Sequence, residues 1–174
     1  MSQPPRITWC QDPARARELA EFFARNVEAT TAYISHSEMW GDRALSPHKW
    51  RSGLPQIFEA EIEPKLRIST DALTSSTCKP ILVAEDQSGL LALAYVTFDG
   101  AAPVPYGIVE DIVVDPAKRG QGVGKYIIDW IAEQARKRDI HRLFLESGES
   151  NHGAHDFFES VGFKKCSIVM LKTL

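Results

Sequence analysis

Residues 108–146 carry the pattern that most constrains the fold of this chain: a β-rich run, a glycine-rich turn, an amphipathic helix and another β-rich run. Residues 108–114 predict a strand, which Asp115-Pro116 ends. Residues 122–138 predict a helix, and residues 143–146 predict the next strand. One helical stripe is apolar, formed by Val123, Ile127, Ile131 and Ala135. Because a helix joins the two strands, they should lie parallel with a right-handed crossover.

The rest of the chain supplies further strands and helices around this unit. Strands are predicted at 6–10, 81–85, 90–98 and 167–171, and helices from Pro13 onward, at 50–62 and at 151–160. The turn Asp86-Gln-Ser-Gly joins two of these strands as an antiparallel hairpin. An antiparallel hairpin followed by a parallel unit predicts a mixed sheet in an α/β domain.

Composition narrows the class of protein. A length of 174 residues suits a single domain, residues 1–174, and 44% apolar with 25% charged residues excludes a disordered or coiled-coil chain. A net charge of -3 argues against nucleic acid or an anionic membrane as partner. No segment reads as a transmembrane span or a signal peptide. Cys10, Cys78 and Cys166 lack CxxC spacing, which favours reduced thiols in a cytoplasmic protein over a zinc site.

The turn from Arg119 to Lys125, with sequence RGQGVGK, has the character of an anion site. Free N–H groups and the dipole at a helix start favour a phosphate, and glycines let it approach the backbone. The Walker A pattern fails because Arg119 and Tyr126 stand where Gly and Ser or Thr are needed, and a G-x-G-x-x-G fingerprint fails at Lys125. The alternative is a turn that only joins the strand to the helix and binds no ligand. In that case the three glycines would lower the stability of the fold and serve no function.

This turn resembles the acyl-CoA pyrophosphate loop, Q/R-x-x-G-x-G/A, of the GNAT superfamily of N-acetyltransferases. Arg119, Gly122 and Gly124 occupy its defined places. Further matches lie before and after it, at Val113-Val114-Asp115-Pro116 and at Asn151, Ala154, Phe157, Phe158, Gly162 and Phe163. The resemblance implies an α/β fold (α+β in some schemes) with a mixed, mostly antiparallel sheet, a central parallel β-α-β unit and flanking helices. It also implies acetyl-CoA as co-substrate and no metal.

The resemblance implies how the cofactor is held. Backbone groups of one strand would pair with the pantetheine amides, N–H groups of the turn would hold the pyrophosphate, and an asparagine would touch the cofactor arm. The implied cofactor-binding residues are Ile112, Val113, Val114, Arg119, Gly120, Gln121, Gly122, Val123, Gly124, Lys125, Asn151 and Phe158.

Acetyl transfer to an amine needs a base, because an alkylammonium with a pKa of about 10.4 must first lose a proton. Glu110 is the first candidate and Asp111 the second. Neighbours on a strand point to opposite faces, so at most one of them should face the reacting centre. The alternative is a structural pair with one carboxylate solvated. Glu146 is a candidate for binding a cationic acceptor.

The departing thiolate lacks an evident proton donor. Phe158 stands where many relatives within the resembled superfamily carry a tyrosine. Substitutes are Ser150, His152, His155 and Tyr106, although a thiolate with a pKa of about 8.5 is itself a tolerable leaving group. His152 and His155 lack a third ligand, so a metal site is not expected.

The resulting hypothesis is an acetyltransferase that moves an acetyl group from acetyl-CoA to a primary amine of a small molecule, by direct attack in a ternary complex. The alternatives are a protein lysine or N-terminal acetyltransferase and a non-catalytic acyl-CoA-binding regulator. Pairing of the last strand with a second chain would give a homodimer. Trp40, Trp50 and Phe58 are read as core rather than acceptor pocket, and residues 136–138 as cations that close a helix.

Overall fold

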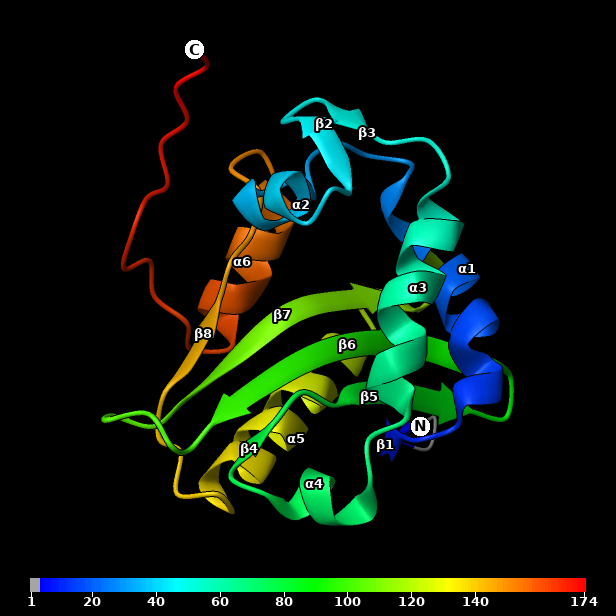
Figure 1. The fold of residues 1–174 in the computed structure, drawn as a ribbon, viewed down its shortest axis with the longest axis vertical. Coiled ribbons are helices and arrows are strands. Elements are labelled where there is room, and N and C mark those ends of the chain that lie inside the picture. The colour runs from blue at the N-terminus through cyan, green and yellow to red at the C-terminus, as the bar shows by residue number, and fades with distance from the viewer. Residues whose placement is uncertain (1–3) are drawn as a thin grey trace. The chain divides into compact units, whose positions relative to one another are not determined.

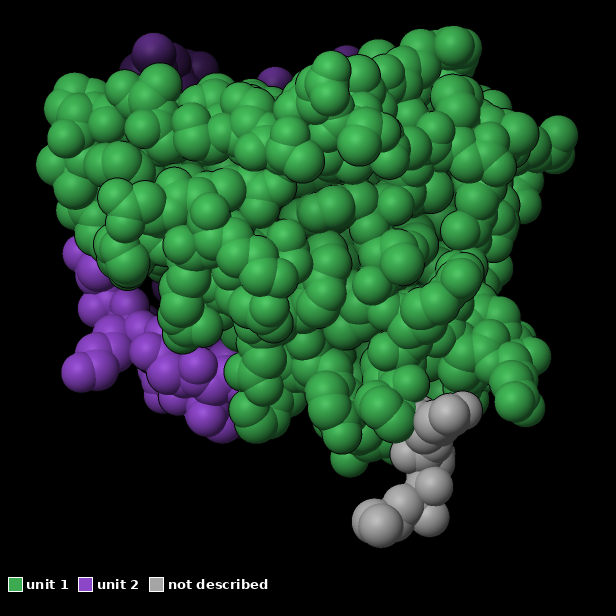
Figure 2. Space-filling view, turned by 90° about the horizontal axis from the view of Figure 1, so that it is seen from below, with its two compact units in different colours: residues 1–29, 53–146 green, residues 30–52, 147–174 purple. Residues whose placement is uncertain are grey.

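The computed structural model describes residues 4–174, and the chain divides into two compact units. The first unit holds residues 1–29 and 53–146, and the second holds residues 30–52 and 147–174 (Figure 2). Each unit is assembled from two separate stretches of the chain, so neither could have been delimited by a single linker in the sequence.

The first unit is a six-stranded mixed sheet with helices on both faces (Figure 1). Its elements are β1 (Arg6–Cys10), η1 (Pro13–Arg15), α1 (Ala16–Val27), α3 (Leu54–Leu66), α4 (Thr70–Thr74), β4 (Thr77–Cys78), β5 (Ile81–Asp86), β6 (Gly89–Asp99), β7 (Tyr106–Val114), η2 (Pro116–Lys118), α5 (Val123–Arg136) and β8 (Leu143–Leu145). The strand order is β1-β5-β6-β7-β8, and β4 pairs with β6. Among the described strands, only β7 and β8 pair in parallel, with α5 between them in sequence. The predicted mixed sheet with a parallel β-α-β unit is confirmed.

The two faces of this sheet are covered by different helices. Tyr95 of β6 points toward α1 and α3, since its ring lies 5.3 Å from that of Phe23 and 5.6 Å from the Lys65 ammonium. Phe98 of the same strand lies on the other face, under Arg138 at the end of α5 and beside Trp9. Residues 91–98 of β6 are all buried, as expected for a strand covered on both sides.

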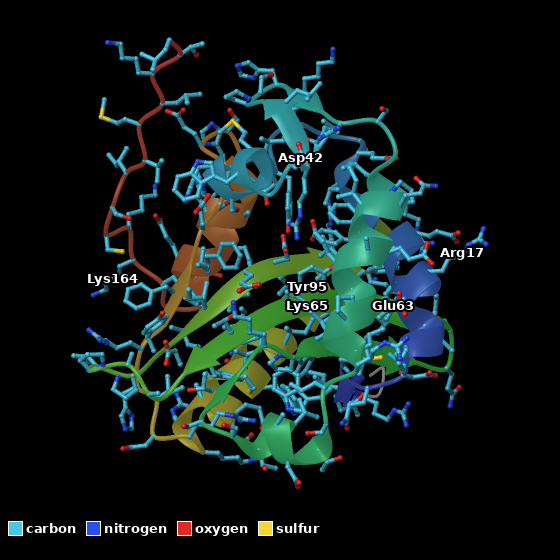
Figure 3. All side chains as sticks on the ribbon, viewed as in Figure 1. Arg17, Asp42, Glu63, Lys65, Tyr95 and Lys164 are labelled. Carbon is cyan, nitrogen blue, oxygen red and sulfur yellow. The ribbon has the colours of Figure 1, made fainter. Side chains whose placement is uncertain are left out.

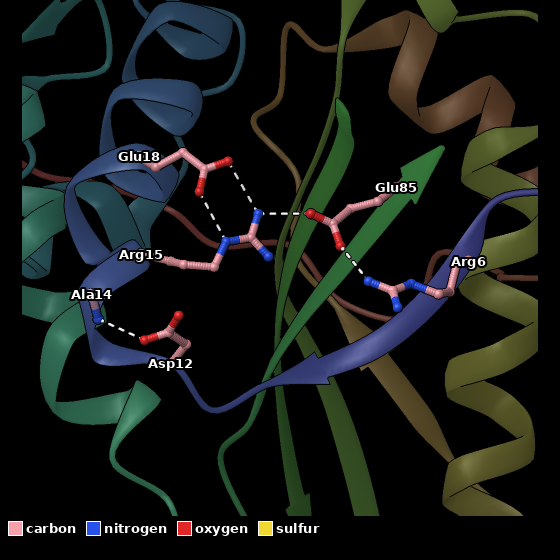
Figure 4. A network of polar contacts seen from close by, with 6 residues as sticks. All are labelled: Arg6, Asp12, Ala14, Arg15, Glu18 and Glu85. Atoms are coloured by element: carbon pink, nitrogen blue, oxygen red, sulfur yellow. Dashed lines mark hydrogen bonds and ion pairs between the residues drawn. The ribbon is translucent and has the colours of Figure 1, made fainter. Parts of the chain in front are cut away.

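An ion-pair network ties α1 to the edge of the sheet (Figure 4). Arg15 bonds Glu18 at 2.8 Å and Glu85 of β5 at 2.7 Å, and Arg6 of β1 contacts the other oxygen of Glu85 at 3.3 Å. The hydrogen bond from Arg15 holds the pKa of Glu18 below its usual range, and partial burial opposes this shift. Asp12 caps the start of η1 by accepting a bond from the Ala14 N–H at 3.0 Å.

The second unit contains α2 (His36–Trp40), the hairpin β2 (Ala44–Ser46) and β3 (Lys49–Trp50), and α6 (His152–Ser160). Ser35 and Glu38 form a capping box at α2, and Glu38, which is buried, also faces Arg43 at 3.7 Å. Gly148 joins the two stretches of this unit: a Cβ there would overlap the carbonyl oxygens of Ala32 and Ile34.

The predicted closing strand at 167–171 is wrong. Residues 164–174 adopt no regular secondary structure, and their apolar side chains are open to solvent, with Ile168 89% and Met170 90% exposed. The run has the composition of a strand, but β-propensity takes effect only against a partner strand, and none of the described residues pairs with it. The helix predicted at 50–62 begins later, at Leu54, because Gly53 ends the preceding turn in a left-handed conformation. No helix within residues 4–174 is long and apolar enough to cross a membrane.

Candidate active site

The pairing between strands β7 and β8 stops before the end of β7. Their parallel pairing runs from Gly107–Leu143 to Val109–Leu145, whereas β7 continues to Val114. On its other side β7 stays paired with β6 up to Val114 opposite Ala92. Within the described residues, the β8-facing edge of residues 110–114 therefore has no partner strand. Polar backbone groups need partners, so this edge suits the amides of an extended ligand. Ile112, Val113 and Val114, predicted to meet pantetheine, all lie along it.

The glycine-rich turn connects the end of β7 to the start of α5. Gly120 and Gly122 have φ angles of 73° and 84°, and Gly122 is the residue that precedes the helix. The bond from Tyr126 N–H to the Gly122 carbonyl, at 3.0 Å, is the first of the helix. The N–H groups of the three residues between them, Val123, Gly124 and Lys125, thus have no acceptor within the helix. The arrangement fits an anion, as the sequence predicts.

Two side chains of this turn donate hydrogen bonds to nearby backbone carbonyls. Arg119 Nε donates to the Val114 carbonyl at 3.1 Å, and Gln121 Nε2 donates to the Ala117 carbonyl at 3.0 Å. Two of the cations that the sequence places here are paired with acids: Lys118 with Asp86 at 3.7 Å, and Lys125 with Asp129 at 2.7 Å. The positive field at the turn is therefore weaker than a count of its cations implies, and the backbone N–H groups matter more.

Glu110 occupies a β-bulge. In the β6–β7 ladder, Tyr95 lies opposite Asp111 and Val96 lies opposite Val109, which leaves Glu110 as an extra residue on β7. The Thr97 hydroxyl donates to Glu110 Oε1 at 2.5 Å. Bulges redirect side chains and are frequent beside active sites.

The bulge brings both acidic side chains to one face of the sheet. Asp111 shares a face with Tyr95, since directly opposite residues in a ladder do. Glu110 shares the face of Thr97, to which it is bonded, and Thr97 lies two residues from Tyr95. This is the face toward α1 and α3, where Tyr95 and Lys65 meet (Figure 3). The two neighbouring carboxylates share a face, contrary to the alternation expected for a regular strand, because alternation fails at a bulge. Glu110 is half-buried and Asp111 is buried.

The two remaining cofactor-site candidates belong to the second unit. Asn151 precedes α6, and its carbonyl accepts bonds from Ala154 and His155, both at 3.0 Å, while its side chain caps nothing. Phe158 is buried between the rings of Phe157 and Phe163, at 5.1 and 5.8 Å. These aromatic contacts account for a phenyl ring at this position without any role in proton transfer.

The residues proposed as substitute proton donors belong to both units. Ser150 and His152 are exposed in the second unit, and the His152 and His155 rings lie 6.0 Å apart. Tyr106 begins β7, about 13 Å along the strand from Glu110. Within residues 4–174, no group of three or more His, Cys, Asp or Glu is arranged to hold a metal ion.

The three aromatic residues expected in the core differ in their burial. Phe58 is core, since it stacks on Phe23 with ring centroids 4.2 Å apart. Trp40 is 82% exposed, so its assignment to the core is wrong, and Trp50 donates its indole N–H to the Thr30 carbonyl at 2.8 Å. Arg138 bonds the Ser75 and Gln134 carbonyls at the far end of α5, about 20 Å from the turn.

Thr97 is the residue that sequence reasoning missed. The available signal was weak: a hydroxyl within a run of buried apolar residues needs a hydrogen-bond partner, but the sequence does not say which. Only the register between β6 and β7 identifies Glu110 as that partner.

Comparisons with known proteins agree with this geometry. The model of the acetyltransferase (GNAT) family matches residues 44–163. The glucosamine 6-phosphate N-acetyltransferase of Trypanosoma brucei brucei is 38% identical over 58 residues, which cover 33% of this chain and 37% of that protein. The ribosomal protein bS18-alanine N-acetyltransferase of Salmonella typhimurium is 29% identical over 87 residues, covering 50% of this chain and 55% of that protein. These alignments thus span about a third to a half of the relatives' own lengths.

The fold has close counterparts among solved structures. A tetramutant of the BH1408 protein from Bacillus halodurans superposes with a TM-score of 0.70 over 97% of this chain and 99% of that chain, at 19% identity. At such low identity the similarity concerns the fold alone.

Proposed function

Since this chain belongs to the acetyltransferase (GNAT) family, whose members use acetyl-CoA as co-substrate, we propose that it transfers an acetyl group from acetyl-CoA to a primary amine of a small molecule. The observation that carries this proposal is the unpaired edge of β7 leading directly into the glycine turn at the start of α5. The family match spans parts of both compact units, which supports treating residues 1–174 as one acetyltransferase domain.

The residues of the first unit fit the cofactor on structural grounds. The β8-facing backbone of Ile112, Val113 and Val114 would pair with the pantetheine amides. The N–H groups from Gln121 to Lys125 would bind the pyrophosphate, on a turn that Gly120 and Gly122 shape and Arg119 braces. Asn151 and Phe158 are proposed as further cofactor contacts from the second unit. Bound acetyl-CoA supplies an activated thioester.

Glu110 is the proposed general base, with Asp111 as second choice. An acceptor amine arrives mostly as an ammonium ion, with a pKa of about 10.4, and must be deprotonated before it attacks in the ternary complex. Half-burial leaves the Glu110 carboxylate accessible, whereas Asp111 is only 6% exposed. The departing thiolate, with a pKa of about 8.5, leaves without a dedicated acid, which suits a site with Phe158 in place of tyrosine.

The test measures release of free CoA thiol from acetyl-CoA over a panel of amines: amino sugars, polyamines, amino acids and aminoglycosides. Glu110→Gln should lower kcat by about a hundredfold or more with a preferred amine. The matched control is Glu63→Gln, an exposed carboxylate of α3 that pairs with Arg67, and it should leave kcat unchanged. Acetyl-CoA binding without thiol release from any amine would overturn the proposal and favour the non-catalytic regulator.

A protein acceptor is the second candidate, because one of the relatives is named as a ribosomal protein alanine N-acetyltransferase. The same assay with peptides that carry a free N-terminal alanine or an internal lysine separates the two. Faster thiol release with a peptide than with every small amine would favour the protein acceptor.

We also propose that the protein is a cytoplasmic homodimer. Its three cysteines are free, which suits a reducing compartment. The exposed apolar run at 168–171 supports self-association, because such a segment can add as a strand to the edge of another sheet. Multi-angle light scattering should give twice the chain mass for the wild type, and Ile168→Ser with Met170→Ser should give the monomer. A monomeric wild type would rule out this assembly.

A further inference from the structure

Thr97 is a buried residue with a polar side chain, and it lies on β6 in the middle of the sheet. Residues 91–98 of β6 are all buried, and only Tyr95 and Thr97 among them carry a polar side chain. A buried hydroxyl costs free energy unless it is hydrogen-bonded, so the partner of Thr97 indicates why a threonine stands there.

That partner is the proposed base. Thr97 Oγ1 donates to Glu110 Oε1 at 2.5 Å, a short bond of the charge-assisted kind. In the ladder Thr97 lies opposite Ile108, two residues before Glu110 on the same face of β7, so the Glu110 carboxylate reaches the Thr97 hydroxyl diagonally. A β-branched side chain has few χ1 rotamers, so the hydroxyl is held in place before the bond forms.

Resting on the proposed role of Glu110 as base, we propose that Thr97 is a positioning residue. Its hydroxyl fixes Oε1, and Oε2 is left to take the proton from the acceptor amine. Among residues 4–174, Glu110 makes no other hydrogen bond or ion pair. The orientation of the carboxylate thus depends on this one bond.

A hydroxyl suits this task better than a cation. Thr97 does not titrate, so its bond persists across the working pH range and does not convert the base into a permanent ion pair. The charged and titratable groups on this face include Asp111 on β7, Tyr95 on β6 and Lys65 on α3, and Glu61 lies one turn before Lys65 on the same helix. The buried side of α1 contributes Asn26 as its only polar side chain.

The central test is Thr97→Val, which removes the donor while keeping the shape of the side chain. With a preferred amine, kcat should fall about tenfold, the size expected for one hydrogen bond to a charged group. Losing a donor also disfavours the charged carboxylate, so the acidic limb of the kcat/KM profile should move to higher pH. The KM for acetyl-CoA should not change. Thr97→Ser keeps the hydroxyl and should restore kcat to within about twofold.

Two controls separate positioning from general damage. Thr8→Val makes the same change on β1, an edge strand of the sheet, and should leave kcat unchanged. Thr97→Ala removes the same hydroxyl with different packing and should reproduce the Val phenotype. In the double variant with Glu110→Gln, the Thr97→Val effect should disappear, because a residue that acts through Glu110 has nothing left to orient.

The outcomes distinguish this inference from the proposed function. A strong effect of Glu110→Gln with wild-type kcat and pH profile in Thr97→Val would overturn the positioning role and leave the acetyltransferase proposal standing. Thr97→Val and Glu110→Gln effects that simply add would make Thr97 a structural residue. Absence of any acetyl transfer by the wild type would overturn both proposals.

Discussion

Arg119 fastens the glycine turn to the strand from which it emerges: its Nε lies 3.1 Å from the carbonyl oxygen of Val114. The bond joins the last residue of β7 to the loop that starts α5, and so connects the two parts of the proposed cofactor site. An arginine at this place therefore acts on the shape of the turn, in addition to any charge it offers.

Replacing Arg119 by methionine should weaken acetyl-CoA binding about five- to tenfold, since the loss of one hydrogen bond loosens the turn. Lysine should not rescue the affinity, because it lacks a donor at the Nε position. Isothermal titration calorimetry gives the Kd. Arg136→Met, at the other end of α5, is the control and should bind normally. An unchanged Kd in Arg119→Met would show that the hydrogen bond from Arg119 to the Val114 carbonyl is not needed for acetyl-CoA binding.

Gly122→Ala should cost both stability and cofactor affinity. A φ of 84° disfavours any side chain by about 1–2 kcal/mol, and the new Cβ would lie 3.6 Å from the Tyr126 ring, within the turn proposed to bind the pyrophosphate. Gly89→Ala, in the β5–β6 turn at a φ of 115°, carries backbone strain without touching the site. Thermal melts should show that both variants are destabilised, and only Gly122→Ala should lose acetyl-CoA binding. Equal affinities in the two variants would argue against the turn as the pyrophosphate site.

Arg15→Met should destabilise the fold in a pH-dependent way. The folded-state pKa of Glu18 is depressed by Arg15, so this pair stabilises the protein above the ordinary glutamate pKa of about 4.3 and loses its effect as pH falls through the lower folded value. At pH 7 the cost should be about 1 kcal/mol, or about 2–4 °C in Tm, because Glu18 is largely solvent-screened. The difference from wild type should shrink as the pH falls below the ordinary glutamate pKa and the folded-state Glu18 becomes protonated.

The control for this pH series is Arg17→Met, which breaks an exposed pair with Glu21 on the same helix. Its Tm should stay within about 1 °C of wild type at every pH. A gap between Arg15→Met and wild type that stays constant down to pH of about 3 would mean that packing of the arginine stem, rather than charge, stabilises this edge of the sheet.

Gly148→Ala should disturb the second unit, because the added methyl group would overlap the Ala32 and Ile34 carbonyls. Hydrogen exchange should rise in residues 30–35, and the protein should lose about 1–3 kcal/mol of stability, the usual cost of overpacking. Gly153→Ala, in α6 with open space around it, is the control and should be neutral or slightly stabilising. Unaltered exchange at 30–35 in Gly148→Ala would contradict the close contact.

The parallel β-α-β unit followed from the sequence because its signals are local. The apolar stripe of α5, the proline after Val114 and the glycines of the turn each act on neighbouring residues, and the structure keeps them all. The strand predicted at 167–171 failed for the opposite reason. A strand exists only when its backbone finds a partner far along the chain, and composition does not supply one.

The sequence by itself predicted an anion site at the glycine turn and showed that two carboxylates stand just before that turn. It could not determine how those carboxylates are aimed. The bulge that turns Glu110 and Asp111 to one face, and the bond from Thr97 across the ladder, arise from the register between β6 and β7. Register is set by the packing of whole strands against α1, α3 and α5, and one extra residue on β7 is enough to override the alternation that governs an isolated strand.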